Sequence, residues 1–438
     1  MRLLPLLLIA LSTTLHAANW PQWRGPSGTG VSAEQGVPVE WSEDSLAWSV
    51  NLRGLGVSSP VVWGDKVFVT YQIGAGKLRP GSHPSLVQGG DPLAAGETPL
   101  GGTRAESNET GVIFALAAFN VSSGDLVWET TMAHQGEFAA VHQKSNMANP
   151  SPTTDGELIY AWFASGQLMA VDMDGAIVWT RNLGSDLGAF DIGWGHSSSP
   201  AIYNDKLVLI CYQVGFSTLL ALDKKTGKDI WRQDREAGVI SYSTPLFVDA
   251  PQGKEMIVNS GFGVEAFNPD TGEQLWHYEE PSRFPIPAPV HRDGIIYLNR
   301  GYRSSPYMAL RVGGRGNVSE SHVAWRSPTG GPYISSLVEY DGLLYFANGQ
   351  GIVSCVDAAT GERVWQERLG GVYSASPVAA DGKIYLSSET GEMLVLKAGR
   401  TAEVLARNKL RGHTLASPAI SDGKIFIRFD TRLVAAVN

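Results

Sequence analysis

Short apolar runs separated by glycine-rich polar turns fill most of the chain. Residues 337–369 show the pattern clearly: the runs LVEY, LLYFAN, GIVSCVD and RVWQERL alternate with turns that include Asp341-Gly342 and Ala359-Thr360-Gly361. Apolar runs of this length bounded by turn residues are typical of β-strands, and glycine suits such turns because it has no Cβ to oppose a positive φ. The pattern therefore predicts four short antiparallel strands joined by hairpins.

The same phrase recurs along the chain. Each copy opens with a Ser-Pro pair or a variant of it, and we place the proline or its equivalent at Pro60, Pro152, Pro200, Pro245, Pro289, Ser336, Pro377 and Pro418. Most of these positions are 41 to 48 residues apart, a period typical of four-stranded propeller blades. Eight copies predict an all-β fold, an eight-bladed β-propeller of four-stranded antiparallel blades that spans residues 45–438.

The last copy is one strand short. After Pro418 it has room for only three strands before Asn438, so a fourth strand must come from elsewhere. Residues 45–52, SLAWSVNL, carry Trp48 at the expected place, and we expect this N-terminal strand to complete the last blade. Closing the ring in this way leaves no free strand edge at its two ends.

A tryptophan follows the turn between the third and fourth strands at a nearly constant distance. The segments AFNVSSGDLVW, AVDMDGAIVW, ALDKKTGKDIW, AFNPDTGEQLW and CVDAATGERVW show this spacing. They resemble the repeats of the pyrroloquinoline-quinone (PQQ)-like repeat β-propellers, which include secreted PQQ-like domain proteins and the propeller subunit of the outer-membrane β-barrel assembly machinery. The resemblance covers nearly the whole chain after residue 18, and it implies that the fourth-strand tryptophan docks one blade on the next. We expect this structural role for Trp48, Trp128, Trp179, Trp231, Trp276, Trp325 and Trp365.

Two blades depart from the repeat. Blade five has a longer turn in GGRGNVSESHVAW, and blade seven carries Val404 or Leu405 where the tryptophan should stand. We expect these two interfaces to be weaker or to be filled differently.

The N-terminal residues resemble an export signal. Arg2 precedes an apolar stretch from Leu3 to Leu11, and Leu15-His16-Ala17-Ala18 offers a cleavage site near Ala17 or Ala18. The apolar stretch is too short for a membrane span, which needs about 20 residues. We therefore expect residues 1–18 to be a signal peptide and the mature chain to be periplasmic or secreted, with no transmembrane segment.

Two further segments lie outside the repeat. Residues 19–44, which include Trp20-Pro21-Gln22-Trp23, are expected to pack across one face of the propeller. A Gly- and Pro-rich insertion at about 73–111 interrupts blade one, and long loops of this kind are binding loops and lids or else disordered spacers.

Composition narrows the function classes. The net charge is −9 without basic runs, which disfavours nucleic acids and anionic membranes as partners.

The only cysteines, Cys211 and Cys355, lie in apolar runs and are expected to be buried thiols, the alternative being one long-range disulfide. The sequence has no P-loop, G-x-S-x-G, H-E-x-x-H or C-x-x-C motif. We expect no metal site, since Asp172 to Gly175 reads as a hairpin turn and His134 and His142 lack a metal-ligand spacing.

In a propeller the links between blades and the loops between second and third strands share one face, around the mouth of the central channel. Aromatic and polar residues gather in these segments, and a concave site with such residues is the default ligand site. The alternative is that they only cap the channel and pair at the surface. The tentative ligand-binding residues are His142, Lys144, Trp194, His196, Tyr242, Arg300, Arg303, Tyr333, Asn348, Tyr373 and Glu389, and Gln213, Phe284, His413 and Asp430 come from the same segments.

These observations favour a non-catalytic scaffold that binds an envelope or extracellular protein or a polysaccharide through its loop face, as a monomer and with no cofactor. One alternative is a small PQQ-dependent alcohol or sugar dehydrogenase, for which the family implies PQQ, calcium and a catalytic carboxylate; Glu389 or Asp430 could serve as that base in principle. A second alternative is a carbohydrate-binding propeller. We assign no catalytic residue.

Overall fold

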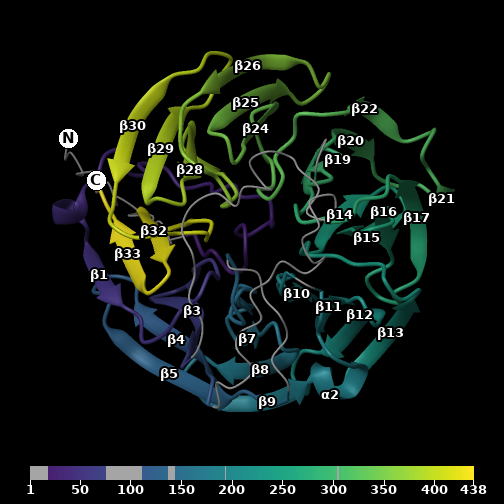
Figure 1. Ribbon diagram of the computed structural model, residues 1–438, viewed down its shortest axis with the longest axis horizontal. Helices are drawn as coiled ribbons and strands as arrows, with labels where there is room; N and C mark the ends of the chain where they lie inside the picture. The colour runs from purple at the N-terminus through teal and green to yellow at the C-terminus, as the bar shows by residue number, and fades with distance from the viewer. Residues whose placement is uncertain (1–17, 75–110, 137–143, 193, 303–304) are drawn as a thin grey trace, which may run out of the picture.

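A computed structural model describes residues 18–74, 111–136, 144–192, 194–302 and 305–438. They form eight sheets around a central channel, seven of four antiparallel strands and one in which a fifth, parallel strand is added to four antiparallel ones (Figure 1). The predicted eight-bladed, all-β propeller is confirmed. Of the predicted signal peptide only Ala18 is described, and most of the insertion expected at 73–111 also lies outside the described residues.

Blades one to four run in chain order. Blade one contains β2 (Val61–Trp63), β3 (Lys66–Ile73), β4 (Ile113–Asn120) and β5 (Leu126–Ala133), and blade two contains β6 (Thr153–Thr154), β7 (Leu158–Trp162), β8 (Gln167–Asp172) and β9 (Ile177–Asn182). Blade three contains β10 (Ala201–Tyr203), β11 (Lys206–Tyr212), β12 (Ser217–Asp223) and β13 (Asp229–Arg235). Blade four contains β14 (Leu246–Ala250), β15 (Gly253–Asn259), β16 (Gly263–Phe267) and β17 (Gln274–Glu279), with β21 (Gly316–Asn317) added at its outer edge.

Blades five to seven follow in the same way. Blade five contains β18 (Val290–Arg292), β19 (Ile295–Asn299), β20 (Tyr307–Arg311) and β22 (Val323–Ser327); blade six contains β23 (Val338–Tyr340), β24 (Leu343–Ala347), β25 (Ile352–Asp357) and β26 (Arg363–Arg368); blade seven contains β27 (Val378–Ala380), β28 (Lys383–Ser387), β29 (Glu392–Lys397) and β30 (Val404–Lys409). The described helices are short: η1 (Glu43–Ser45) precedes the ring and α2 (Leu183–Leu187) follows β9. Among the described residues, no helix has the length and apolar character needed to span a bilayer.

Blade eight is built from both ends of the chain. It contains β31 (Ala419–Ser421), β32 (Lys424–Phe429), β33 (Arg432–Ala436) and β1 (Trp48–Asn51). β1 pairs antiparallel with β33, with Trp48 opposite Ala435 and Asn51 opposite Arg432. The prediction that an N-terminal strand completes the last blade is confirmed.

Tryptophans of the outer strands lie at the junctions between blades. The indole Nε1 of each donates to a backbone carbonyl in the third-to-fourth-strand turn of the next blade, at 2.8–3.1 Å: Trp48 to Val121, Trp128 to Met173, Trp179 to Lys224, Trp231 to Pro269, Trp325 to Ala358 and Trp365 to Gly399. Five of these rings also lie against a glycine of that turn, namely Gly124, Gly175, Gly227, Gly272 and Gly361. The repeat therefore pairs the tryptophan of one blade with the glycine of the next.

Trp276 is held differently from the other tryptophans. It is fully buried beneath β21, which pairs in parallel with β17. Its Nε1 donates to Glu255 Oε2 at 2.9 Å, and the same oxygen accepts from the backbone N–H of Gly313 at 3.2 Å. The longer turn of blade five thus folds back over blade four, and a carboxylate takes the place of the backbone acceptor.

The N-terminal segment covers blade seven, where the tryptophan is missing. Trp41 is buried in a cluster that joins blades seven, eight and one, and Leu405 packs against this cluster. The backbone N–H of Trp41 donates to Asn408 Oδ1 at 3.0 Å, and Asn408 Nδ2 donates to Val39 at 2.8 Å. The blade seven interface is therefore filled differently, by an indole from the other end of the chain.

Replacing Gly227 with alanine is expected to cost about 1–3 kcal/mol, because its Cβ would lie 2.7 Å from the Trp179 ring at a φ of +69°. Gly382 is a matched control: its φ is also +69°, but a Cβ there meets nothing within 4 Å. Thermal unfolding should show Gly227→Ala to be less stable than Gly382→Ala. Equal losses would mean that backbone strain, rather than contact with the tryptophan, makes the turn glycine necessary.

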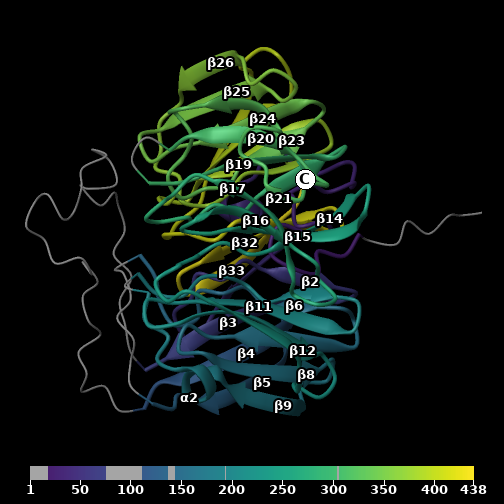
Figure 2. The ribbon, with the colours of Figure 1, turned by 90° about the vertical axis from the view of Figure 1, so that its right-hand side faces the viewer.

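The N-terminal segment crosses the face opposite the blade links. Trp20 bridges to Val62 on β2, and Val31 bridges to Ala379 on β27. The side chain of Arg24 is buried, and its Nη2 donates to the carbonyl of Leu337. Figure 2 shows the propeller edge-on. One end of the channel is thus covered by residues that precede the first blade.

Both cysteines are buried free thiols, Cys211 in β11 and Cys355 in β25. Burial raises the pKa of Cys355 to about 12, and desolvation raises that of Cys211 further. The thiols therefore stay protonated and act as small apolar side chains.

Candidate binding site at the channel mouth

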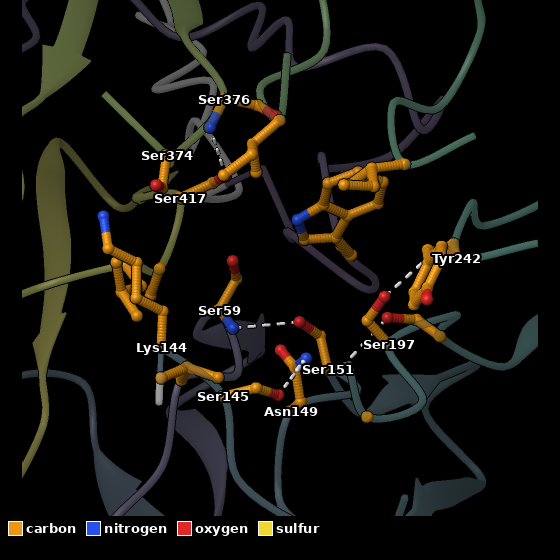
Figure 3. Close-up of a pocket in the computed structure, with 18 of the residues that line it drawn as sticks. Ser59, Lys144, Ser145, Asn149, Ser151, Ser197, Tyr242, Ser374, Ser376 and Ser417 are labelled. Atoms are coloured by element: carbon orange, nitrogen blue, oxygen red, sulfur yellow. Dashed lines mark hydrogen bonds between the residues drawn. The ribbon is translucent and has the colours of Figure 1, made fainter. Parts of the chain in front are cut away.

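A belt of hydroxyl groups follows the channel wall across six of the eight blade junctions. In each blade concerned, the residue before the proline donates its backbone N–H to the hydroxyl of the equivalent residue in the next blade. The N–O distances are 2.9–3.0 Å. The donor and acceptor pairs are Ser59 to Ser151, Ser151 to Ser199, Ser199 to Thr244, Ala288 to Ser336, Ser336 to Ser376, and Ser376 to Ser417; part of the belt is visible in Figure 3.

This belt corrects one assignment in the repeat. The Ser336 hydroxyl accepts from the Ala288 N–H, and the Ser336 N–H donates to the Ser376 hydroxyl. Ser336 therefore corresponds to the serine of the Ser-Pro pair. Leu337, not Ser336, therefore stands where the other blades have proline. Ala288 has no hydroxyl, so the belt is interrupted at the junction of blades four and five.

A cavity with about 1040 Å³ of empty space, open to solvent, lies inside the belt. Trp23 of the N-terminal segment reaches it from one side, and Lys144, Trp194 and Tyr333 line it from the blade links. Tyr242 and Ser197 lie together on the wall opposite Lys144, as Figure 3 shows. The cavity therefore has distinct sides built by different blades.

Aromatic side chains make up one side of the mouth. Trp194, Tyr242, Phe284, Tyr302 and Tyr333 form a cluster with Ile192, Ile240 and Ile286. The rings of Trp194 and Phe284 meet edge to face with centroids 5.5 Å apart, and those of Phe284 and Tyr302 at 4.9 Å. Burial raises the pKa of Tyr242 and Tyr333 well above the usual value, so both phenols stay neutral. This side offers flat, uncharged stacking surface.

Lys144 lines the other side of the mouth and is backed by three more charged side chains. Lys144 Nζ lies 2.8 Å from both carboxylate oxygens of Glu389, whose side chain is fully buried. Ser374 Oγ donates to Glu389 Oε1, and His413 Nε2 lies 3.8 Å from Glu389 Oε2. His413 Nδ1 lies 3.0 Å from Asp430 Oδ1. We call Lys144, Glu389, His413 and Asp430 the charge cluster.

Hydrogen bonds in the charge cluster decide which groups are ionised. Burial opposes the negative charge of Glu389, but the nearby His413 imidazole and the hydrogen bonds from Lys144 hold its pKa below the ordinary value. Burial also opposes the positive charge of His413, but its hydrogen bond to Asp430 and the nearby Glu389 carboxylate outweigh burial and raise its pKa to about 9. His413 is therefore an imidazolium at neutral pH, and the two positive and two negative charges cancel.

The raised pKa of His413 predicts a pH-dependent stability. A group with a higher pKa when folded contributes stability below its unfolded pKa of about 6.5, and this is lost as the pH rises through the folded value. The wild type should therefore exceed His413→Gln in thermal midpoint most at pH 6–6.5, and the gap should shrink by pH 9. A gap that stays constant over this range would show that His413 is not charged in the folded protein.

The structure brings together four of the predicted ligand residues at the cavity: Lys144, Trp194, Tyr242 and Tyr333. Glu389 lies behind Lys144. Tyr373 is buried, with its hydroxyl beside Gly371. Asn348 shapes its own loop by accepting the backbone N–H groups of Gln350 and Ile352. His142 and Arg303 lie outside the described residues.

His196 and Arg300 are buried away from the cavity lining. His196 packs on the Trp162 ring with centroids 4.2 Å apart, and burial lowers its pKa to about 3. The guanidinium of Arg300 donates to the backbone carbonyls of Ser260, Gly263 and Glu280 at 2.6–3.0 Å. These contacts give Arg300 a role in fixing the loops of blades four and five.

Sequence reasoning missed several lining residues, among them Trp23, Ser374 and the hydroxyl belt. The Ser-Pro repeat marked the position of the belt but not its function, because the bond joins residues about 40 or more positions apart. Trp23 gave no signal beyond its place in an aromatic N-terminal segment.

Comparisons with known proteins bear on this site. A family model described as outer membrane protein assembly factor BamB, with PQQ-type repeats, matches residues 29–186, 113–285 and 316–438. Tetrathionate hydrolase of Acidithiobacillus ferrooxidans is 27% identical over 202 residues, 43% of this chain and 37% of that protein. Quinoprotein ethanol dehydrogenase of Pseudomonas aeruginosa is 29% identical over 170 residues (35% and 26%), and BamB of Alkalilimnicola ehrlichii is 25% identical over 185 residues (42% and 43%). The chain thus aligns with less than half the length of these curated relatives.

Solved structures share the fold. Quinohemoprotein alcohol dehydrogenase from Comamonas testosteroni superimposes with a TM-score of 0.64 at 12% identity, covering 95% of this chain and 80% of that one. BamB from Moraxella catarrhalis superimposes with a TM-score of 0.52 at 15% identity, covering 84% and 98%. At these identities the likeness supports the propeller architecture alone.

Proposed function

We propose, from the premise that this chain belongs to the family of the outer membrane protein assembly factor BamB, that it is a non-catalytic binding propeller whose channel mouth holds a segment of a partner protein. The N-terminal residues lead us to propose further that the chain is exported and acts in the periplasm. The proposed scaffold role agrees with the family description and with the curated BamB relatives.

The observation that carries the proposal is the contrast between the two sides of the mouth. The aromatic side offers neutral rings. On the other side Lys144 is the only charged residue among the described residues of the lining, and the Glu389 carboxylate pairs with it. A site of this kind favours stacking and hydrogen bonding over acid–base chemistry. Aromatic anchors at the centre of a desolvated pocket commonly carry most of the energy of a protein–protein contact.

The second candidate is a quinone-dependent dehydrogenase, favoured by the quinoprotein relatives and by the propeller fold of a quinohemoprotein enzyme. The residues present do not fit its calcium ion. Calcium takes six to eight oxygen ligands, whereas Glu389 is bound by Lys144 and Asp430 by His413, and the described residues contain no group of three His, Cys, Asp or Glu able to hold a metal. Incubation with PQQ and Ca²⁺, followed by absorbance and dye-reduction measurements, tests this candidate; a bound chromophore with dye reduction would favour it over the scaffold.

Replacing Trp194 with alanine should weaken partner binding by tenfold or more, since aromatic residues at such a centre contribute about 2 kcal/mol or more. The measurement is recovery of the partner from envelope extract on the immobilised protein, followed by titration of the purified partner. Phe262 is a matched control because it is an aromatic residue of a loop on the same face, 37% exposed, and is outside the cavity lining.

Phe262→Ala should leave binding unchanged. Equal recovery by wild type and Trp194→Ala would contradict the proposal. Binding to a glycan array that depends on Trp194, without any recovered protein, would replace the protein partner with a carbohydrate.

A further inference from the structure

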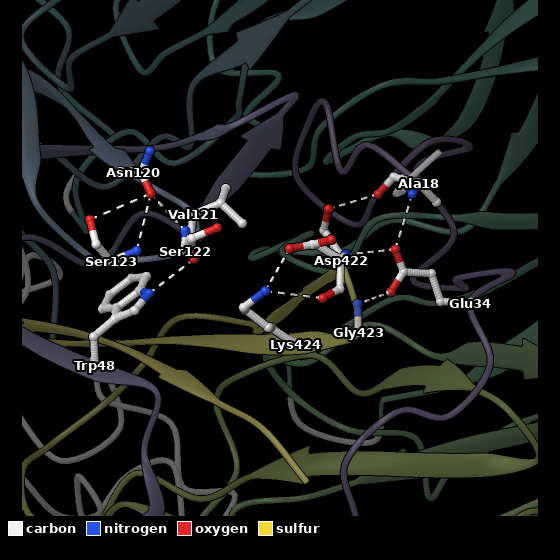
Figure 4. Close-up of polar contacts among 11 residues, drawn as sticks. Ala18, Glu34, Trp48, Asn120, Val121, Ser122, Ser123, Asp422, Gly423 and Lys424 are labelled. Carbon is white, nitrogen blue, oxygen red and sulfur yellow. Dashed lines mark hydrogen bonds and ion pairs between the residues drawn. The ribbon is translucent and has the colours of Figure 1, made fainter. Parts of the chain in front are cut away.

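Both backbone groups of Ala18 are bonded, the N–H to Glu34 of the N-terminal segment and the carbonyl to Ser421 of the last blade. Its N–H donates to Glu34 Oε1 at 3.0 Å, and its carbonyl accepts from Ser421 Oγ at 2.8 Å (Figure 4). The next residue is fixed to the first blade, since Asn19 Oδ1 accepts the backbone N–H of Gly64 at 2.9 Å. These two residues therefore bridge the junction between blades eight and one, where Trp48 also docks.

Glu34 is the centre of this arrangement. Its Oε1 accepts from the N–H of Asp422 at 2.7 Å as well as from Ala18, and its Oε2 accepts from the N–H of Gly423 at 2.8 Å. In the unprocessed chain all three donors are neutral backbone amides. Among the described residues no lysine, arginine or histidine forms an ion pair with Glu34, so a full negative charge is gathered here without a cation.

The neighbouring charges are paired among themselves. Lys424 Nζ lies 2.5 Å from Asp422 Oδ2 in the same hairpin. On the blade one side, Lys66 Nζ lies 3.2 Å from Asp65 Oδ1, next to Gly64. Within the part of the chain that the structure describes, the hairpins on both sides of the junction thus provide no cation for Glu34.

We propose that the leader ends at Ala17, one residue earlier than the predicted signal peptide 1–18, so that Ala18 is the first residue of the processed chain. Its α-ammonium then forms an ion pair with Glu34 and fastens the N-terminus across the junction that closes the ring. The covalent step is hydrolysis of the bond between Ala17 and Ala18 by a signal peptidase. Water adds to that bond, its oxygen ends in the new carboxylate of Ala17, and the amine released on Ala18 takes up a proton. The sequence before this bond ends in a small residue, as such cleavage sites require.

Cleavage at this bond changes the chemistry of an existing contact without moving it. The same nitrogen that donates as an amide becomes a cation with three protons, 3.0 Å from a carboxylate oxygen. Hydrogen bonds between ionised partners are about twice as strong as neutral ones. Cleavage one residue later would remove Ala18 together with its contacts to Glu34 and Ser421.

The first test is the N-terminal sequence of the exported protein, read by Edman degradation or by mass spectrometry of the N-terminal peptide. The expected first residue is Ala18. A chain that begins at Asn19 or later would overturn the proposal, as would a chain that keeps the leader.

The second test asks whether the ion pair exists in the processed protein. Glu34→Gln keeps an oxygen acceptor and removes the charge, and Glu40→Gln is the control because Glu40 is an exposed carboxylate of the same segment. An α-amine has an ordinary pKa of about 7.7–8.0, and an ion pair raises it. At pH 7.5 an amine-reactive label should therefore modify the N-terminus about threefold to tenfold faster in Glu34→Gln than in the wild type or in Glu40→Gln.

The pH profile separates an ion pair from a merely structural acceptor. The raised pKa belongs to the folded state, so the advantage of wild type over Glu34→Gln in thermal midpoint should be complete near pH 7 and decline as the pH rises toward 10. Equal labelling rates in wild type and Glu34→Gln would overturn the proposal. So would a difference in thermal midpoint between these two proteins that stays constant from pH 7 to pH 10.

Discussion

Replacement of Trp48 with alanine is expected to destabilise the protein by about 3–5 kcal/mol, the usual cost of removing a buried tryptophan side chain. Trp48 is 7% exposed, packs in the cluster that joins blades seven, eight and one, and donates from Nε1 to Val121 at 3.0 Å. Its strand is also the one that pairs with β33 to close the ring. With an unfolding entropy of about 2.1 cal/mol/K per residue, the loss corresponds to a fall of about 3–6 °C in the thermal midpoint.

Two controls make this prediction specific. Trp48→Phe keeps most of the buried area and loses only the hydrogen bond, so it should cost much less. Leu126→Ala removes an apolar side chain from an outer strand where it is 53% exposed, and it should change the midpoint little. If Trp48→Ala were as stable as Leu126→Ala, the closing strand would not hold the ring together.

Replacement of Glu389 with leucine is expected to cost a similar amount, about 3–5 kcal/mol, because breaking a buried ion pair leaves its cations poorly compensated. Glu389 is fully buried and is the carboxylate that Lys144 and His413 share. The pKa of His413 should fall from about 9 as one of the two carboxylates beside it is lost. Thermal unfolding and the pH titration of the His413 imidazole by NMR measure both effects.

The double variant Lys144→Met with Glu389→Leu provides the control. Replacing both partners of a buried pair by apolar residues of similar volume is often neutral or stabilising, so the double variant should recover much of the loss. A double variant that is less stable than either single variant would contradict the interpretation that the two charges serve mainly to neutralise each other.

Periodicity explains why the architecture could be predicted. Most blades repeat the same order of short strands and tight turns, and residues 45–52 carry Trp48 at the position that the repeat gives to a fourth-strand tryptophan. The resemblance to PQQ-like repeats implied that Trp179 docks on the next blade, and the structure places its ring against Gly227 there. Local sequence suffices where a contact recurs in most of the blades.

Contacts that occur once in the ring could not be predicted. Lys144 and Glu389 are 245 positions apart, and only the closed ring brings them together. Arg300 stands in a loop of the mouth face, but the backbone carbonyls that surround it depend on how two neighbouring loops fold. Trp41 fills the place left by the missing tryptophan of blade seven from the other end of the chain, which no local pattern could reveal.

Photo-crosslinking tests directly whether the channel mouth holds a partner protein. A benzophenone amino acid at Tyr333, which lines the cavity, should give one crosslinked product with an envelope protein, and the same probe at Val178, 48% exposed on an outer strand, should give none. Crosslinks of equal yield from both positions, or a partner captured only from Val178, would contradict the claim.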